Sequence, residues 1–234
     1  MNFSNRTVLI TGATGNLGRA VAVAFAELGA NLALVDRRRE RLEQTFGAED
    51  ERRLFLVADL LVQAQVNAAV AQATARFGRI DVLCNIAGGF RMGEPVHATS
   101  DEDWGFLFDI NARTLLHAVR AVVPRMIAAG GGEIVSVAAF AAQKGARKMG
   151  AYCASKDAVI RLTESMAAEL REQNINVNCV LPTIIDTPEN RAAMPKADPA
   201  RWVAPADLAS AIAFLASDGA RAIHGAALPV TGLS

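Results

Sequence analysis

Short apolar runs rich in β-branched residues alternate along this chain with longer amphipathic stretches. The first run, Thr7 to Ile10, ends in a cluster of glycines, and apolar residues then recur at helical spacing from Leu17 to Leu28. Strands that alternate with helices of this length pair in parallel, and right-handed crossovers place the helices on both faces of the sheet. The pattern predicts an α/β fold with strands at 7–10, 32–35, 54–57, 81–84, 133–137, 175–181 and 226–230, and helices at 17–28, 38–46, 64–77, 101–129, 152–171 and 205–216.

Length and composition fit one domain over residues 1–234. Lys plus Arg and Asp plus Glu number 24 each, so no charge excess points to a nucleic acid or membrane partner. Three scattered cysteines, no secretory leader and no run of about 18 apolar residues favour a cytoplasmic protein. His97, His117 and His224 are isolated, and we expect no metal site.

Prolines at 182, 188, 195 and 199 mark the long segment at about 183–204, which we interpret as a substrate lid.

Three glycines, Gly12, Gly15 and Gly18, lie where the first strand becomes the first helix. Glycines there permit a tight turn and allow a pyrophosphate to approach the backbone. The helix N-terminus adds free N–H groups and a partial positive charge. The placement of the cluster between strand and helix predicts a nucleotide site.

Asp36 ends the second predicted strand, 18 residues after Gly18. A carboxylate at this place can accept hydrogen bonds from an adenosine ribose and repels a 2′-phosphate, which favours NAD as the cofactor. Arg37 and the two arginines after it could neutralise a phosphate instead, so NADP is the alternative.

Tyr152 and Lys156 are four residues apart at the start of a predicted helix, so their side chains share a face. An ammonium group beside a phenol favours the phenolate, so we expect a lowered pKa for Tyr152. A phenol tuned in this way can exchange a proton with a carbonyl or alcohol oxygen. Tyr152 is the only tyrosine of the chain.

Further motifs lie along the chain in a fixed order: Thr11 to Gly18, Asp59, Asn85 to Gly88, Asn111, Tyr152 to Lys156, and Pro182 to Thr187. Taken together, these motifs resemble those of the short-chain dehydrogenase/reductase family. The resemblance covers nearly the whole chain and implies an oxidoreductase with a seven-stranded doubly wound Rossmann sheet and a bound nicotinamide dinucleotide. It also implies a homodimer or homotetramer built on the long helices at about 101–129 and 152–172.

The family pattern assigns a role to each matching residue. Tyr152 would be the acid/base, Lys156 would bind the nicotinamide ribose and lower the pKa of Tyr152, and Asn111 would hold a water of a proton relay. The other residues would contact the cofactor along its length: Gly12, Gly15, Asn16, Leu17 and Gly18 at the pyrophosphate, Asp36 and Arg37 at the adenosine ribose, Asp59 and Leu60 at the adenine, Asn85, Ala87 and Gly88 along its path, and Pro182, Ile185 and Thr187 near the nicotinamide.

The chain departs from the family pattern in three places. The middle glycine is at position 15, and Asn16 stands where the family has glycine. The family's catalytic serine lies 13 residues before the tyrosine, and that position is Ala139. Ser136 lies too far inside to substitute, and Gln143 and Lys144 are weak candidates. Thr183 also stands where a glycine usually follows Pro182.

Several of these departures are similar to quinoid dihydropteridine reductase, which also has alanine in place of the serine. We therefore expect hydride transfer between a nicotinamide and a small carbonyl or alcohol substrate. A quinonoid pterin or another cyclic imine is the alternative substrate. A dinucleotide-sensing protein without catalysis is the alternative of a different class.

Overall fold

The strand β1 lies near the middle of one seven-stranded sheet in which every neighbouring pair is parallel, in the order β3-β2-β1-β4-β5-β6-β7. The structure is a computed structural model that describes all residues from 1 to 234. The strands are β1 Thr7–Thr11, β2 Asn31–Asp36, β3 Arg53–Val57, β4 Val82–Asn85, β5 Gly132–Val137, β6 Ile175–Pro182 and β7 Ala227–Val230. The predicted α/β class, strand number and parallel pairing are confirmed.

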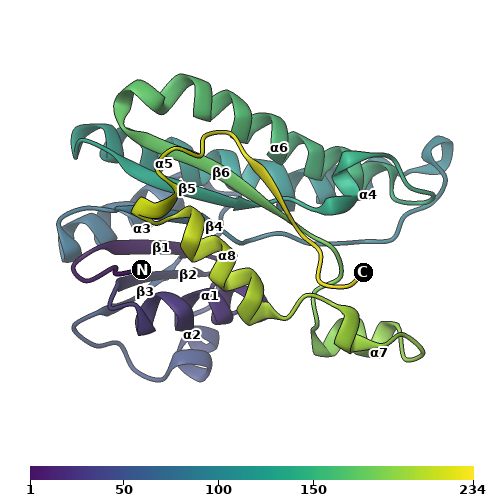
Figure 1. Cartoon of the computed structure of the whole chain (residues 1–234), viewed down its shortest axis with the longest axis horizontal. Helices are drawn as coiled ribbons and strands as arrows, with labels where there is room; N and C mark the ends of the chain where they lie inside the picture. Colours follow the sequence, from purple (N-terminus) through teal and green to yellow (C-terminus); the bar gives the residue numbers. More distant parts are fainter.

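Helices cover both faces of this sheet (Figure 1). As drawn, α6 lies above the sheet, and α1, α2 and α8 lie below it. The helices are α1 Asn16–Glu27, α2 Arg39–Phe46, α3 Gln63–Phe77, α4 Asp101–Phe108, α5 Thr114–Ala128, α6 Gly150–Leu170, α7 Pro188–Ala193 and α8 Pro205–Leu215.

Alternation along the strands divides the core into two layers. On β1, Val8 and Ile10 join the cluster under α1 and α8, whereas Leu9 joins the cluster under α3, α5 and α6. Successive side chains of a strand point to opposite faces, so a strand covered on both sides is apolar throughout. This explains why β1 reads as an unbroken buried run.

The predicted single helix at 101–129 is wrong in detail. The structure has α4 to Phe108, one π-helical turn over Asp109–Arg113, and then α5. A π turn adds a residue to the helical ladder and is frequent at functional sites. Asn111 lies within it, so the turn re-aims a predicted site residue.

The segment at 183–204 also carries more structure than the expected loop. It holds α7 and a 3₁₀ turn at Pro199–Arg201. Its two ends are joined, because the Asp186 N–H donates to the Val203 carbonyl oxygen at 2.8 Å and the Val203 N–H donates to that of Ile184 at 2.9 Å. Trp202 and Val203, near the end of this segment, are buried.

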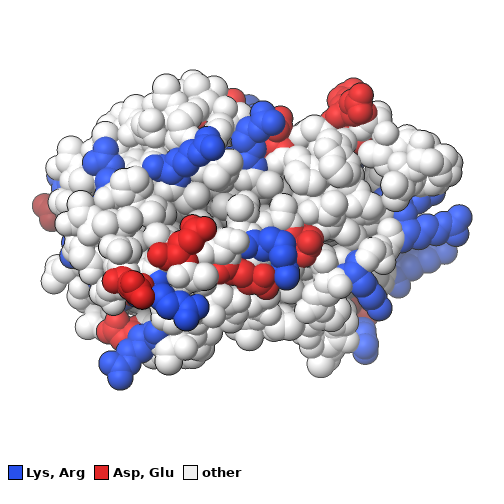
Figure 2. All heavy atoms as spheres, turned by 90° about the horizontal axis from the view of Figure 1, so that it is seen from above, with Lys and Arg blue, Asp and Glu red and all other residues white.

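Charged side chains of both signs are spread over the face seen from above (Figure 2). Lys and Arg gather at the right-hand end of that view, the end at which α4 and α7 lie in Figure 1. None of the helices is both long enough and apolar enough to cross a membrane.

Candidate active site

The predicted site residues gather at the carboxyl ends of the parallel strands. β1 has β2 on one side and β4 on the other, so the chain order reverses at this point of the sheet. In open α/β sheets, ligands bind in the crevice outside such a switch point. Asp36 ends β2, Asn85 ends β4 and Pro182 ends β6.

No side chain fits at Gly12 or Gly18, because other backbone segments approach closely at both positions. Gly12 has a φ of +65°, and a Cβ built on it would lie 2.9 Å from the Cα of Ala87. A Cβ on Gly18 would overlap the carbonyl oxygen of Gly12 and lie 2.9 Å from the Cα of Ala13. Gly15 is less constrained, because its φ is −70° and its Cβ would meet only the Gly12 oxygen, at 3.4 Å. The displaced middle glycine is therefore compatible with the turn.

Helix α1 starts at Asn16 without a side-chain cap. The first N–H groups of a helix have no partner within it, so those of Asn16, Leu17 and Gly18 are available to an anion at this terminus. Together with the glycine turn, they form a cradle whose chemistry fits a pyrophosphate.

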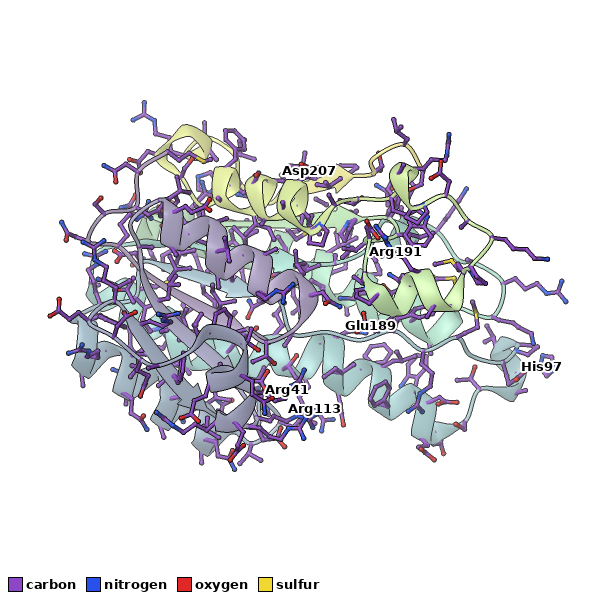
Figure 3. The ribbon with its side chains drawn as sticks, turned by 90° about the horizontal axis from the view of Figure 1, so that it is seen from below. Arg41, His97, Arg113, Glu189, Arg191 and Asp207 are labelled. Atoms are coloured by element: carbon purple, nitrogen blue, oxygen red, sulfur yellow. The ribbon has the colours of Figure 1, made fainter.

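The Asn16 side chain makes a contact that the sequence did not indicate. Its Nδ2 donates to an oxygen of Glu189 on α7 at 2.7 Å. Figure 3 labels Glu189 between α7 and the adjacent end of α1. A glycine at position 16 could not make this contact, so the departure from the family pattern joins the glycine turn to the predicted lid.

Asp36 reaches the glycine turn from the end of β2. Its Oδ2 accepts a hydrogen bond of 2.5 Å from the Thr14 hydroxyl, whereas Arg37 next to it is exposed. Asp59 lies half-buried after β3, and its Oδ1 accepts from the Leu61 N–H at 2.9 Å. Leu60 is buried. These positions follow the edge of the sheet from β1 to β3, where the adenosine half of a dinucleotide would lie.

Asn85, Ala87 and Gly88 continue this line beyond β4. The Asn85 Nδ2 donates to the Ser136 hydroxyl at 3.3 Å, and its buried Oδ1 has no hydrogen-bond partner. Such an orphaned acceptor is costly unless a ligand or water satisfies it. The unpartnered Asn85 oxygen, the N–H groups of the α1 cradle and the Asp36 carboxylate together fit a bound dinucleotide.

The side chains of Asn111 and Lys156 both approach the backbone of Gly88. A Cβ built on Gly88 would lie 3.0 Å from the Oδ1 of Asn111 and 3.0 Å from the Nζ of Lys156. Glycine therefore leaves the space in which two polar groups from the π turn and α6 approach the loop after β4. This close approach had no signal in the sequence beyond the resemblance.

The environment of Tyr152 corrects the expected pKa. Burial raises the pKa of Tyr152 to about 12, and the neighbouring Cys153 thiol adds to the rise. Lys156 does not counter this, because its ammonium donates instead to the Val137 carbonyl oxygen at 2.8 Å. Burial also lowers the pKa of Lys156 to about 8. The expected lowering of the phenol pKa is therefore absent from this structure, because burial raises that pKa and the ammonium is bonded to Val137.

The Asn111 side chain is hydrogen-bonded to the loop after β4. Its Oδ1 accepts from the Gly89 N–H at 2.9 Å, and its Nδ2 donates to the Gly89 carbonyl oxygen and the Ser155 hydroxyl, both at 3.1 Å. One Oδ1 lone pair stays free beside Lys156. These hydrogen bonds hold the loop that carries Phe90 in place. The sequence did not predict this connection between Asn111 and the loop.

Pro182, Ile185 and Thr187 lead from β6 into the predicted lid. The Ile185 carbonyl oxygen accepts from the Asn190 Nδ2 at 2.8 Å. The Thr187 hydroxyl caps α7 by accepting from the Asn190 N–H at 3.2 Å. The Thr187 oxygen thus accepts a hydrogen bond within the helix that it starts.

Ala139 follows β5 and is 5% exposed. Ser136 is fully buried and bonded to Asn85, which agrees with the expectation that it cannot substitute for a serine at position 139. Phe90 meets Tyr152 edge to face, with ring centroids 4.9 Å apart. The ring of Tyr152 therefore packs against an aromatic neighbour.

Two other features lie away from these residues. A cavity of about 540 Å³ opens between α1 and the segment after α2, lined by Val23, Phe46 and Arg53 among others, and it contains none of the predicted site residues. No group of three His, Cys, Asp or Glu side chains is placed to hold a metal ion.

Comparisons with known proteins agree with this architecture. A family model described as short chain dehydrogenase matches residues 6–198. D-threitol dehydrogenase of Mycolicibacterium smegmatis is 36% identical over 97% of this chain and 92% of its own length. Levodione reductase of Leifsonia aquatica is 33% identical over 98% and 94% of the two chains. The structure of an NAD⁺-bound xylitol dehydrogenase superposes with a TM-score of 0.90 at 30% identity, over 99% of this chain and all of the other.

Proposed function

This chain belongs to the short-chain dehydrogenase/reductase family and is an NAD(P)-dependent oxidoreductase of small alcohol or carbonyl substrates, and we propose that Tyr152, Lys156 and Asn111 carry its chemistry. The observation that carries this proposal is the convergence of Asn111 Oδ1 and Lys156 Nζ at Gly88. It lies beside the switch point of the sheet, one helical turn from Tyr152 along α6. The comparisons give no specific support to kinship with dihydropteridine reductase.

Tyr152 exchanges the proton of the reaction. With its pKa raised to about 12, the phenol holds its proton at neutral pH and can donate it to a substrate carbonyl oxygen. In the oxidative direction the same oxygen must first lose its proton. Lys156, with its pKa lowered to about 8, exchanges protons near neutral pH, and the free Oδ1 lone pair of Asn111 can hold the water that leads to it.

A nicotinamide dinucleotide, when bound, supplies or accepts the hydride. The α1 cradle of Gly12, Gly15, Asn16, Leu17 and Gly18 would hold its pyrophosphate. Asp36, Asp59 and Leu60 would hold the adenosine half, and Asn85, Ala87 and Gly88 would line its path. Pro182, Ile185 and Thr187 would meet the nicotinamide end. The protein's part is to bind, orient and exclude water.

NAD is the proposed cofactor. The Asp36 carboxylate is oriented by Thr14 at the glycine turn, and it would repel a 2′-phosphate. Arg37 is exposed and could turn toward a phosphate, so NADP is the competing outcome. Affinities for NAD⁺ and NADP⁺, measured by calorimetry, test this choice.

We further propose that residues 183–204 act as a substrate lid on the single domain and that the enzyme is a cytoplasmic homodimer or homotetramer. Trp104 and Phe106 on α4 are 49% and 39% exposed, which is typical of a helix face that a partner covers. The three cysteines are free and buried, as suits a reducing compartment. Light scattering after size-exclusion chromatography tests the oligomer.

The assay that tests the function follows nicotinamide oxidation or reduction with a panel of small alcohols, ketones and a quinonoid dihydropterin. The pterin belongs in the panel because Ala139 offers no hydroxyl to the substrate oxygen, and an electron-poor imine needs that donor least. Tight dinucleotide binding with no turnover of any panel member would favour the sensing alternative instead.

A further inference from the structure

Phe90 borders the phenol of Tyr152 with a ring that is itself half open to solvent. The two rings meet at an interplanar angle of 87° with centroids 4.9 Å apart, and Phe90 is 54% exposed. Edge-to-face pairs of this geometry are attractive beyond the apolar area that they bury. One surface of Phe90 thus packs against the tyrosine, and more than half of the residue stays open to solvent.

The backbone fixes Phe90 in this place. Both polar groups of Gly89 are bonded to the side chain of Asn111, which is only 2% exposed. A Cβ on Gly89 would already touch Ile110 at 3.4 Å, so the loop lies directly on the π turn. The Phe90 ring is therefore held in place before a ligand binds. Packing an apolar group against it requires little further ordering of the loop.

The charged side chains that line the small pocket beside Tyr152 are paired with one another: Arg91 with Asp103, and Lys148 with Glu94 at 3.5 Å. Ala139, directly after β5, has no polar side-chain group to offer. Arg91, next to Phe90, is bonded to Asp103 and lies over the ring of Phe106 at 4.3 Å. A polyol would leave its hydroxyl groups poorly paired here, which costs affinity.

We propose that Phe90 is a specificity-determining residue and that the substrate carries an apolar ring at or directly beside the carbon that is oxidised. The class is alicyclic or aryl secondary alcohols and their ketones, in preference to acyclic polyols. The ring packs on the exposed face of Phe90 while the alcohol oxygen reaches Tyr152. This proposal rests on the proposed role of Tyr152.

The test compares cyclohexanol and 1-phenylethanol with glycerol as substrates of the wild type, Phe90→Ala and Phe90→Leu. The proposal predicts a wild-type preference for the ring alcohols. Phe90→Ala lowers kcat/KM for them by about tenfold or more, mainly through KM, and changes that for glycerol by less than about threefold. Phe90→Leu, which keeps an apolar wall, retains an intermediate preference.

A binding readout separates recognition from chemistry. The tertiary alcohol 1-methylcyclohexanol cannot be oxidised to a ketone, and its inhibition constant should rise in Phe90→Ala by about the factor seen in KM. Phe214→Ala is the control, since Phe214 is also an exposed phenylalanine, at 41%, and lies on α8 away from the site. It should leave the ring preference unchanged.

Three results overturn the proposal: a wild-type preference for glycerol, turnover of neither ring alcohol, or an equal loss on ring and glycerol substrates in Phe90→Ala. The last result would indicate that Phe90 only supports Tyr152. A failure of the proposed function is seen separately, as undiminished turnover of any substrate by Tyr152→Phe.

Discussion

The side-chain ammonium of Lys156 donates a hydrogen bond to the main-chain carbonyl oxygen of Val137, with 2.8 Å between Nζ and O. This contact joins α6 to the end of β5 and directs the ammonium toward the sheet. It holds a buried lysine in one orientation beside Gly88 and Asn111. The proposed proton exchange therefore involves a buried amine as well as the phenol.

Replacing Lys156 by methionine should change the pH dependence of stability. Burial lowers the pKa of Lys156 from 10.5 to about 8, so the unfolded chain binds more protons than the folded one between these values. Wild-type stability should therefore rise with pH across this window, by about 3 kcal/mol relative to Lys156→Met. Urea unfolding between pH 7 and 10 measures the difference, and a flat difference would contradict the buried, lowered-pKa lysine.

The glycine turn offers a matched pair of substitutions. Gly18→Ala should destabilise the fold by more than about 2 kcal/mol, because its Cβ meets the backbone of Gly12 and Ala13, which cannot move aside cheaply. Gly15→Ala is the control, with an ordinary φ and no contact closer than 3.4 Å, and it should cost less than about 1 kcal/mol. Urea unfolding compares the two. Equal losses would mean that the turn is not packed as described.

Cofactor choice should depend on Asp36. Asp36→Ala should weaken NAD⁺ binding by about tenfold or more, since a charged hydrogen bond to the ribose is lost, and should strengthen NADP⁺ binding because a like charge is removed. Arg37→Ala, at the exposed neighbour, should leave NAD⁺ affinity nearly unchanged. Calorimetric titration with both dinucleotides measures these effects. An Asp36→Ala variant with unaltered preference would remove the argument for NAD.

Restoring the hydroxyl at position 139 should accelerate carbonyl reduction. Ala139→Ser adds a donor at the position from which the family contacts the substrate oxygen. A single preorganised donor accounts for roughly 10²–10³ in other enzymes, and one added without its supporting shell should give about tenfold in kcat/KM. Steady-state kinetics with a ketone substrate measures the gain. An unchanged or lower rate would show that the site is built to work without this hydroxyl.

Much of the fold could be predicted from the sequence. The apolar runs that end in glycine or polar residues gave every strand to within two residues, because a strand covered on both faces must be apolar along its length. The glycine turn was equally predictable, since Gly12 and Gly18 have no room for a side chain.

Other features depend on contacts between distant parts of the chain. Asn111 in the π turn bonds to Gly89, 22 residues away, and the lid contact joins Asn16 to Glu189, 173 residues away. The pKa of Tyr152 was mispredicted because helical spacing indicates which side chains are neighbours but not how deeply each is buried. The carbonyl of Val137, to which Lys156 donates, is a main-chain group without any sequence signature.

The most direct measurement of the central claim is the turnover of Tyr152→Phe under conditions in which its dinucleotide affinity is shown by calorimetry to equal that of the wild type. The substitution removes one oxygen and keeps the ring that packs on Phe90. Turnover should fall by about 10²–10⁴ if the phenol exchanges the proton with the substrate oxygen. A rate close to that of the wild type would contradict the account.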